Sequence, residues 1–138
     1  MFFKKKKGNN KINYLVNVCA LLIHAAKIDE NYTENEEKII KKTIIELGSS
    51  EEDILKIIEE AKIIEQDSNQ ILNFTREIKN LSEQKKIKIV EALWSIIYSD
   101  RDVDNYEANL MRRLAGLLYI DNKTMGDIKN KIQNKLSK

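Results

Sequence analysis

The sequence has little of what ends a helix: its 138 residues include four glycines and no proline. These two residue types interrupt helices most strongly, so their scarcity favours a mostly helical chain. The single cysteine, Cys19, cannot form an internal disulfide, which argues against a disulfide-stabilised secreted domain. The chain also lacks an uninterrupted apolar run of about 18 residues, the length that a membrane-spanning helix needs. We therefore expect a cytoplasmic, all-α protein.

The charges are distributed unevenly. The net charge is +2, but residues 1–11 hold five lysines and no acid, so the rest of the chain is mildly acidic. The basic character thus comes from the N-terminal end and gives no indication of a nucleic-acid partner. Hydrophobic residues make up 42% of the sequence, enough for one folded domain with a core. We expect a disordered basic head at 1–11 and a single helical domain at 12–138.

The head also has a second interpretation. Two aromatic residues precede four consecutive lysines: Phe2, Phe3, Lys4, Lys5, Lys6 and Lys7. Each basic residue adds about 1 kcal/mol of attraction near an anionic membrane surface. A weak peripheral membrane contact is therefore an alternative to a purely solubilising terminus.

Apolar residues recur at helical spacing along the chain, and cap-type residues divide this pattern into seven helices. Thr33 with Glu36 and Asp104 with Glu107 have capping-box spacing, and Gly48 is a plausible helix end. The expected helices cover 12–28, 33–47, 54–64, a shorter segment with Phe74 and Ile78, 82–97, 104–118 and a last helix from Asp121. The short connections between them predict antiparallel neighbours in a compact bundle.

The chain matches itself when it is shifted by 71 residues. Leu22 then aligns with Leu93, Asp29 with Asp100, and Glu36 with Glu107. An apolar helix, an acidic turn and a capped helix therefore occur twice in the same register. We interpret this as an internal duplication in which the first and second helices match the fifth and sixth through a pseudo-two-fold axis.

The two acidic turns carry oxygen-bearing side chains at the same four places. The first turn has Asp29, Asn31, Thr33 and Glu36, and the second has Asp100, Asp102, Asp104 and Glu107. Alternating oxygen ligands are typical of the start of a calcium loop, because hard cations need several of them. An EF-hand is excluded, since it requires a glycine at its sixth position and a glutamate at its twelfth.

Two explanations of the turns remain. Thr33 with Glu36 and Asp104 with Glu107 can act simply as helix caps, each stabilising by about 1 kcal/mol. Capping does not account for Asp29 and Asp100, because each follows the C-terminal end of an apolar helix, where the helix dipole disfavours a negative charge. Such violations of a local rule are expected at functional positions.

The doubled pattern resembles that of the TerB-like family, which includes the tellurite-resistance protein TerB and a domain of some membrane-anchored co-chaperones. The motif reads "AKIDENYTENE" and "IYSDRDVDNYE", and "LMRRLAGLLYI" is similar to the family's continuation. The resemblance implies a seven-helix fold that gathers the acidic turns on one face and binds a divalent cation such as Ca²⁺, or a protein partner. By position it implies four ligands, Asp29, Glu36, Asp100 and Glu107, with Asn31, Asp102 and Asp104 as further oxygen donors. Glu30 and Arg101 replace the family's turn glycines, which changes the backbone geometry available to each turn.

No nucleophile–base set, phosphate-binding loop or zinc pattern is present, so we expect a non-enzymatic protein. His24 is expected at the surface or core edge, and Cys19 and Trp94 in the core. Three functions stay open: a cation- or partner-binding module in the stress response to tellurite or metals, a metal-free interaction or co-chaperone accessory domain, and a membrane-peripheral adaptor.

Overall fold

The structure is a computed structural model that describes residues 2–27, 33–67, 72–76, 78–100 and 105–136. Side chains are described for 14–27, 33–67, 74–76, 78–99 and 109–135. Within these ranges the chain is helical and contains no strand, which confirms the all-α prediction. The elements are α1 (Phe2–Ala26), α2 (Glu34–Glu46), α3 (Ile54–Asp67), α4 (Leu72–Thr75), α5 (Glu83–Ile97), α6 (Asn105–Leu117) and α7 (Asn122–Leu136), with 3₁₀ turns η1 (Ile78–Asn80) and η2 (Tyr98–Asp100).

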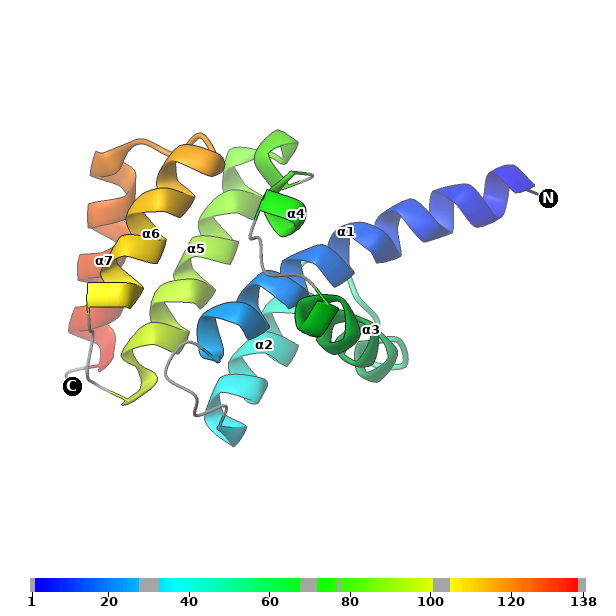
Figure 1. Cartoon of the computed structure of the whole chain (residues 1–138), viewed down its shortest axis with the longest axis horizontal. Coiled ribbons are helices and arrows are strands. Elements are labelled where there is room, and N and C mark those ends of the chain that lie inside the picture. Colours follow the sequence, from blue (N-terminus) through cyan, green and yellow to red (C-terminus); the bar gives the residue numbers. More distant parts are fainter. Residues whose placement is uncertain (1, 28–32, 68–71, 77, 101–104, 137–138) are drawn as a thin grey trace.

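Two helices, α1 and α5, form the centre of the bundle and pack against each other (Figure 1). Spacing alone predicted a narrow apolar stripe on the second half of α1, but the buried surface of this helix is much wider than a stripe. Val18, Ala20 and Leu21 lie between the stripe positions and are as fully buried as Cys19 and Leu22. Asn17 and His24, seven residues apart on one face, are half-buried, so α1 is an interior helix with a polar edge.

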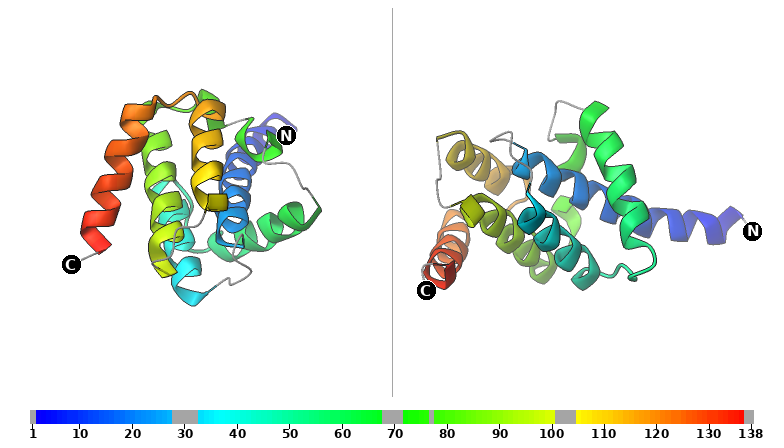
Figure 2. Two further views of the ribbon diagram at one scale, coloured as in Figure 1. Left: turned by 60° about the vertical axis from the view of Figure 1, so that its left-hand side comes forward. Right: turned by 90° about the horizontal axis from the view of Figure 1, so that it is seen from below.

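The remaining helices surround this pair. The most extensive packing is that of α3 along α1, and α2 and α4 also contact α1. On the other side, α7 and α2 cover α5, while α6 packs beside α4 and α7 (Figure 2). Phe74 of α4 and Ile78 of η1 are completely buried, as the apolar pattern predicted. They do not belong to one helix, however, because the chain leaves α4 after a single turn and reaches Ile78 in η1.

Three predicted helix starts are confirmed by their hydrogen bonds. The Thr33 hydroxyl accepts from the backbone N–H of Glu36, and the Glu36 carboxylate accepts from that of Thr33, which completes a capping box. The Ser82 hydroxyl accepts from the Lys85 N–H, and Asp121 Oδ1 accepts from the Thr124 N–H at 2.7 Å. Each contact satisfies a backbone donor that has no partner within its helix.

The C-terminal ends of α2 and α6 have the same hydrogen-bond pattern. After α2, the N–H groups of Gly48 and Ser49 donate to the carbonyls of Ile45 and Ile44. After α6, the N–H groups of Tyr119 and Ile120 donate in the same way to the carbonyls of Gly116 and Ala115. This Schellman arrangement places its first residue beyond the cap at positive φ, which is 129° for Gly48 and 58° for Tyr119. The glycine was predicted, whereas the tyrosine gives no such signal and holds a conformation that its Cβ disfavours.

The start of α1 differs from the prediction. Residues 2–11, expected to form a disordered head, are helical, and α1 continues without a break from Phe2 into the core (Figure 1). Lysine is a good helix former and no proline interrupts the stretch, so α1 continues through Gly8, Asn9 and Asn10 although these residue types favour helix ends. The side chains of Phe2–Lys7 lie outside the described set, so their expected membrane contact stays a prediction.

The helix boundaries keep the 71-residue spacing seen in the sequence. Helices α1 and α5 end at Ala26 and Ile97, and α2 and α6 have the same length of 13 residues. Their superposition through a pseudo-two-fold axis remains a prediction.

Candidate functional site

The acidic turns are the candidate site from sequence, and most of their side chains lie outside the described residues. This applies to Asp29, Asn31, Asp102 and Asp104 altogether. For Asp100 in η2 and Glu107 in α6 the structure describes the backbone and not the side chain. Thr33 and Glu36 are the two turn positions whose side chains are described.

Glu36 is the proposed ligand position that the structure defines best, and it acts as a cap. Its side chain is 2% exposed, and Oε1 accepts the Thr33 N–H at 2.7 Å. A charge-assisted contact of this kind is strong, and the positive end of α2 favours the carboxylate further. Glu36 is therefore committed to holding the start of α2. A cation in this turn would depend mainly on Asp29 and on the second turn.

The helix ends that flank the two turns lie toward the same end of the bundle. The N-terminal ends of α2 and α6 and the C-terminal ends of α1 and α5 face the lower side of the molecule (Figure 1). Asn35, in the first turn of α2, and Ser99, at the end of α5, line the same surface groove. The described backbone on either side of the acidic turns is thus compatible with carboxylates from both turns gathering on one face.

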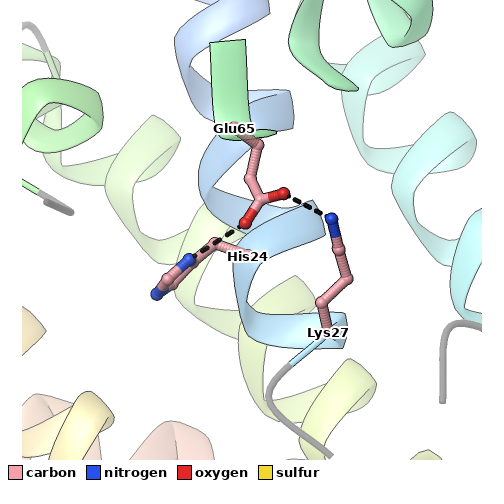
Figure 3. A network of polar contacts seen from close by, with 3 residues as sticks. All are labelled: His24, Lys27 and Glu65. Carbon is pink, nitrogen blue, oxygen red and sulfur yellow. Dashed lines mark hydrogen bonds and ion pairs between the residues drawn. The ribbon is translucent and has the colours of Figure 1, made fainter. Parts of the chain in front are cut away.

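A polar network that the sequence did not reveal joins α1 to α3. Glu65, only 9% exposed, accepts from Lys27 Nζ at 2.7 Å through Oε1, and its Oε2 lies 3.3 Å from His24 Nδ1 (Figure 3). One signal was available: Glu65 continues the buried stripe Ile54, Ile58, Ala61 of α3 at helical spacing. A carboxylate in such a stripe needs a partner, and Lys27 and His24 provide it.

The same network determines the position of His24. His24 is half-buried at the edge of the core, as predicted, and its ring lies 6.4 Å from that of Phe74. In the part of the chain that the structure describes, its polar neighbours are Glu65 and Lys27, and the arrangement is that of a structural contact between helices.

Cys19 is a core residue, as predicted. Its side chain is fully buried on α1, and this burial raises the pKa of the thiol to about 12. Because the thiolate is the reactive form, a thiol with this pKa is not activated as a nucleophile or a metal ligand. Trp94 is likewise in the core, and its ring stacks on Tyr98 at 5.7 Å between ring centroids.

Among the side chains that the structure describes, no three histidine, cysteine or acidic groups converge in a way that could hold a metal ion. The same part of the chain contains no helix with the length and apolarity needed to cross a bilayer. The described site is therefore made of helix ends, a capping box with a buried carboxylate and an ion pair with a buried carboxylate.

These features define a class: a small all-helical module whose two central helices both lead into acid-rich connections. The family model of the tellurite resistance protein TerB matches residues 15–130. The chain therefore belongs to the TerB family, which confirms the resemblance seen in its motifs. Searches of curated proteins and of solved structures gave no match.

Proposed function

We propose that this TerB-family protein is a non-enzymatic binding module whose two acidic turns together bind a divalent cation, with Ca²⁺ as the ion of suitable chemistry. Asp29 and Asp100 are the principal ligands, Glu107 completes the second turn, and Asn31, Asp102 and Asp104 supply further oxygens. Glu36 contributes chiefly by fixing the start of α2. The cellular role that follows is a stress-response function in tellurite or metal handling, exercised through a protein partner.

The observation that supports the proposal is the common direction of the helix ends around the turns. Asn35 and Ser99 line one groove, and each lies within a few residues of its own acidic turn. Carboxylates brought together in this way repel one another until a cation neutralises them, and hard oxygen ligands favour Ca²⁺ over softer metals. Ligands from two separate turns must be ordered on binding, so a modest affinity is expected.

Thermal unfolding with calcium tests the proposal. With a dissociation constant of about 1 mM, 10 mM calcium stabilises the fold by about 1.4 kcal/mol. The wild-type midpoint should rise, and that of the variant Asp29→Asn with Asp100→Asn should not respond. The matched control, Asp67→Asn with Asp127→Asn, removes the same charge from exposed positions elsewhere and should keep the response. If calcium moves no midpoint beyond the effect of equal ionic strength, the cation proposal is wrong.

The capping box favours a second candidate, a metal-free interaction or co-chaperone accessory domain. A carboxylate buried against the backbone of its own helix start serves the fold, and its counterpart Asp104 with Glu107 has the same spacing. In that case calcium does not change the melting midpoint of the wild type or of the variant Asp29→Asn with Asp100→Asn. The variant should, however, bind a partner protein more weakly than the wild type does.

The projection of α1 beyond the bundle favours a peripheral membrane contact as an accessory property (Figure 1). Phe2, Phe3 and Lys4 to Lys7 occupy the first turns of that helix. Co-sedimentation with anionic vesicles should be weak, salt-sensitive and abolished by deleting residues 2–7. Equal binding of the shortened chain would exclude this contact.

A further inference from the structure

A groove of about 560 Å³ runs along one side of the bundle, away from the His24–Glu65 network. Helix α2 forms one wall, the C-terminal part of α7 forms the other, and α5 forms the floor. The groove residues of α2 extend from Asn35 to Glu46, which corresponds to about 16 Å of helix. This length is that of a partner helix of about three turns.

The floor of the groove is apolar and firmly held. Ala92 and Ile132 are 4% and 5% exposed and belong to the core, and Ile39 packs against that core from α2. Ser95, between them, directs its hydroxyl to the carbonyl of Glu91 in its own helix at 2.8 Å. Ile39 of α2 is the most accessible of these three apolar side chains, so the groove offers a narrow apolar strip between polar side chains, along which an amphipathic helix can lie.

The rim of the groove is basic. Both carboxylates that line it are already paired, Glu46 with Lys88 at 3.8 Å and Glu91 with Lys131 at 2.7 Å. Lys38, Lys42 and Lys135 also line the groove, and they form no ion pair with any side chain in the described ranges. The charge available to a ligand is thus positive on both walls.

We propose that this groove between α2, α5 and α7 is the docking site for an acidic amphipathic helix of a partner protein. The apolar face of that helix lies on Ile39, Ala92 and Ile132, and its carboxylates pair with Lys38, Lys42 and Lys135. The complementary charges set orientation and association rate, and contact with Ile39 adds apolar burial. The site uses none of the proposed cation ligands, so the two proposals succeed or fail separately.

Fluorescence anisotropy with the full chain tests this site. The probe is a labelled peptide of about 15 residues made of leucine, alanine and glutamate, with the leucines at helical spacing. Lys38→Glu with Lys42→Glu should weaken its binding by at least about tenfold, because like charges then face each other. Ser95→Phe should weaken it similarly by filling the groove while leaving every charge in place.

Matched controls separate docking from general charge attraction. Lys56→Glu with Lys123→Glu makes the same charge change at exposed positions outside the groove and should alter binding by less than about twofold. A peptide of equal composition with scrambled leucines, and one with lysine in place of glutamate, should bind far more weakly. Melting curves of all variants should match that of the wild type.

Four outcomes overturn the proposal. They are no binding of the acidic peptide, equal binding of the scrambled peptide, full binding to the Lys38 and Lys42 variant, and displacement of the peptide by inorganic phosphate at equal concentration. A concentration-dependent dimer that is lost with Ser95→Phe would assign the groove to a second copy of the chain instead.

Discussion

Among the described residues, the two shortest Lys–Glu contacts each connect a central helix to a helix that covers it, and they differ in their surroundings. Lys27 with Glu65 joins α1 to α3, and Lys131 with Glu91 joins α7 to α5. Both have an N–O distance of 2.7 Å. The side chains of Glu65 and Lys27 are 9% and 41% exposed, whereas those of Glu91 and Lys131 are 27% and 67% exposed, so the first pair differs chiefly in its buried carboxylate.

The comparison shows that distance alone does not measure the value of an ion pair. Water competes for the exposed pair, and holding two long side chains together costs conformational entropy, so such pairs contribute little. The buried carboxylate has exchanged its hydration for Lys27 and His24, and removing them leaves it without compensation. In the 71-residue register, Glu65 matches Leu136 and His24 matches Ser95. The buried polar network therefore belongs to the first half alone, and Ser95 lines the groove in the second.

The largest effect is expected from removing the buried carboxylate of Glu65. Glu65→Ala removes the charged acceptor of Lys27 and leaves a small void, and we expect the free energy of unfolding to fall by about 2 kcal/mol. Glu91→Ala should leave the denaturation midpoint within experimental error. Guanidinium denaturation of both variants measures the difference, and equal losses would contradict the role assigned to burial.

A second expected effect compares the two central helices at one matched position, where α1 has Cys19 and α5 has Val90. Folding raises the pKa of the Cys19 thiol from 9.0 to about 12, so above pH 9 the unfolded chain binds fewer protons than the folded one. Stability should therefore fall as pH rises, by about 1.4 kcal/mol between pH 8 and pH 10.

The measurement is urea denaturation at the two pH values for the wild type and for Cys19→Val. Lysines and tyrosines also titrate in this range, so the difference between the two proteins isolates the thiol. If the variant loses as much stability as the wild type between pH 8 and pH 10, the buried thiol is not the cause.

The smallest effect concerns the ends of α2 and α6. Gly48→Ala places a Cβ at positive φ and should lower stability by about 1 kcal/mol. Tyr119→Gly should have the opposite sign and a smaller size, because it relieves the backbone but removes an exposed ring that lies near Lys79 and Lys86. Thermal melts of both variants test the pair, and a loss of stability for Tyr119→Gly would show that its contacts outweigh the strain.

The sequence predicted what depends on near neighbours. Thr33, Ser82 and Asp121 were identified as caps because their hydrogen bonds reach only three residues along the chain. The contact of Glu65 with Lys27 joins residues 38 positions apart, and no local pattern encodes it. The wide buried surface of α1 between Leu15 and Ala26 was also missed, because small residues such as Ala20 interrupt an apolar stripe without marking a solvent face.

The candidate site also has a part that the sequence predicted and a part that it did not. The sequence identified Glu36 as part of a capping box and as a ligand position, and the structure confirms the cap. The ligand role of Asp29, Asp100 and Glu107 stays a prediction, since their side chains lie outside the described residues. The groove gave no signal in the sequence, because its walls come from three helices that are distant in the chain.

The interior position of α1 has a consequence for the chain as it leaves the ribosome. Helix α1 is synthesised before the helices that pack on it, and the last of these along the chain, α5, begins at Glu83. At about 5–20 residues per second, the apolar surface of α1 waits several seconds for that partner. The first half cannot complete its own core during this time, so the nascent chain exposes an aggregation-prone helix until the second half emerges. The part of the α1 surface that α5 covers is thus the last part of this helix to be buried.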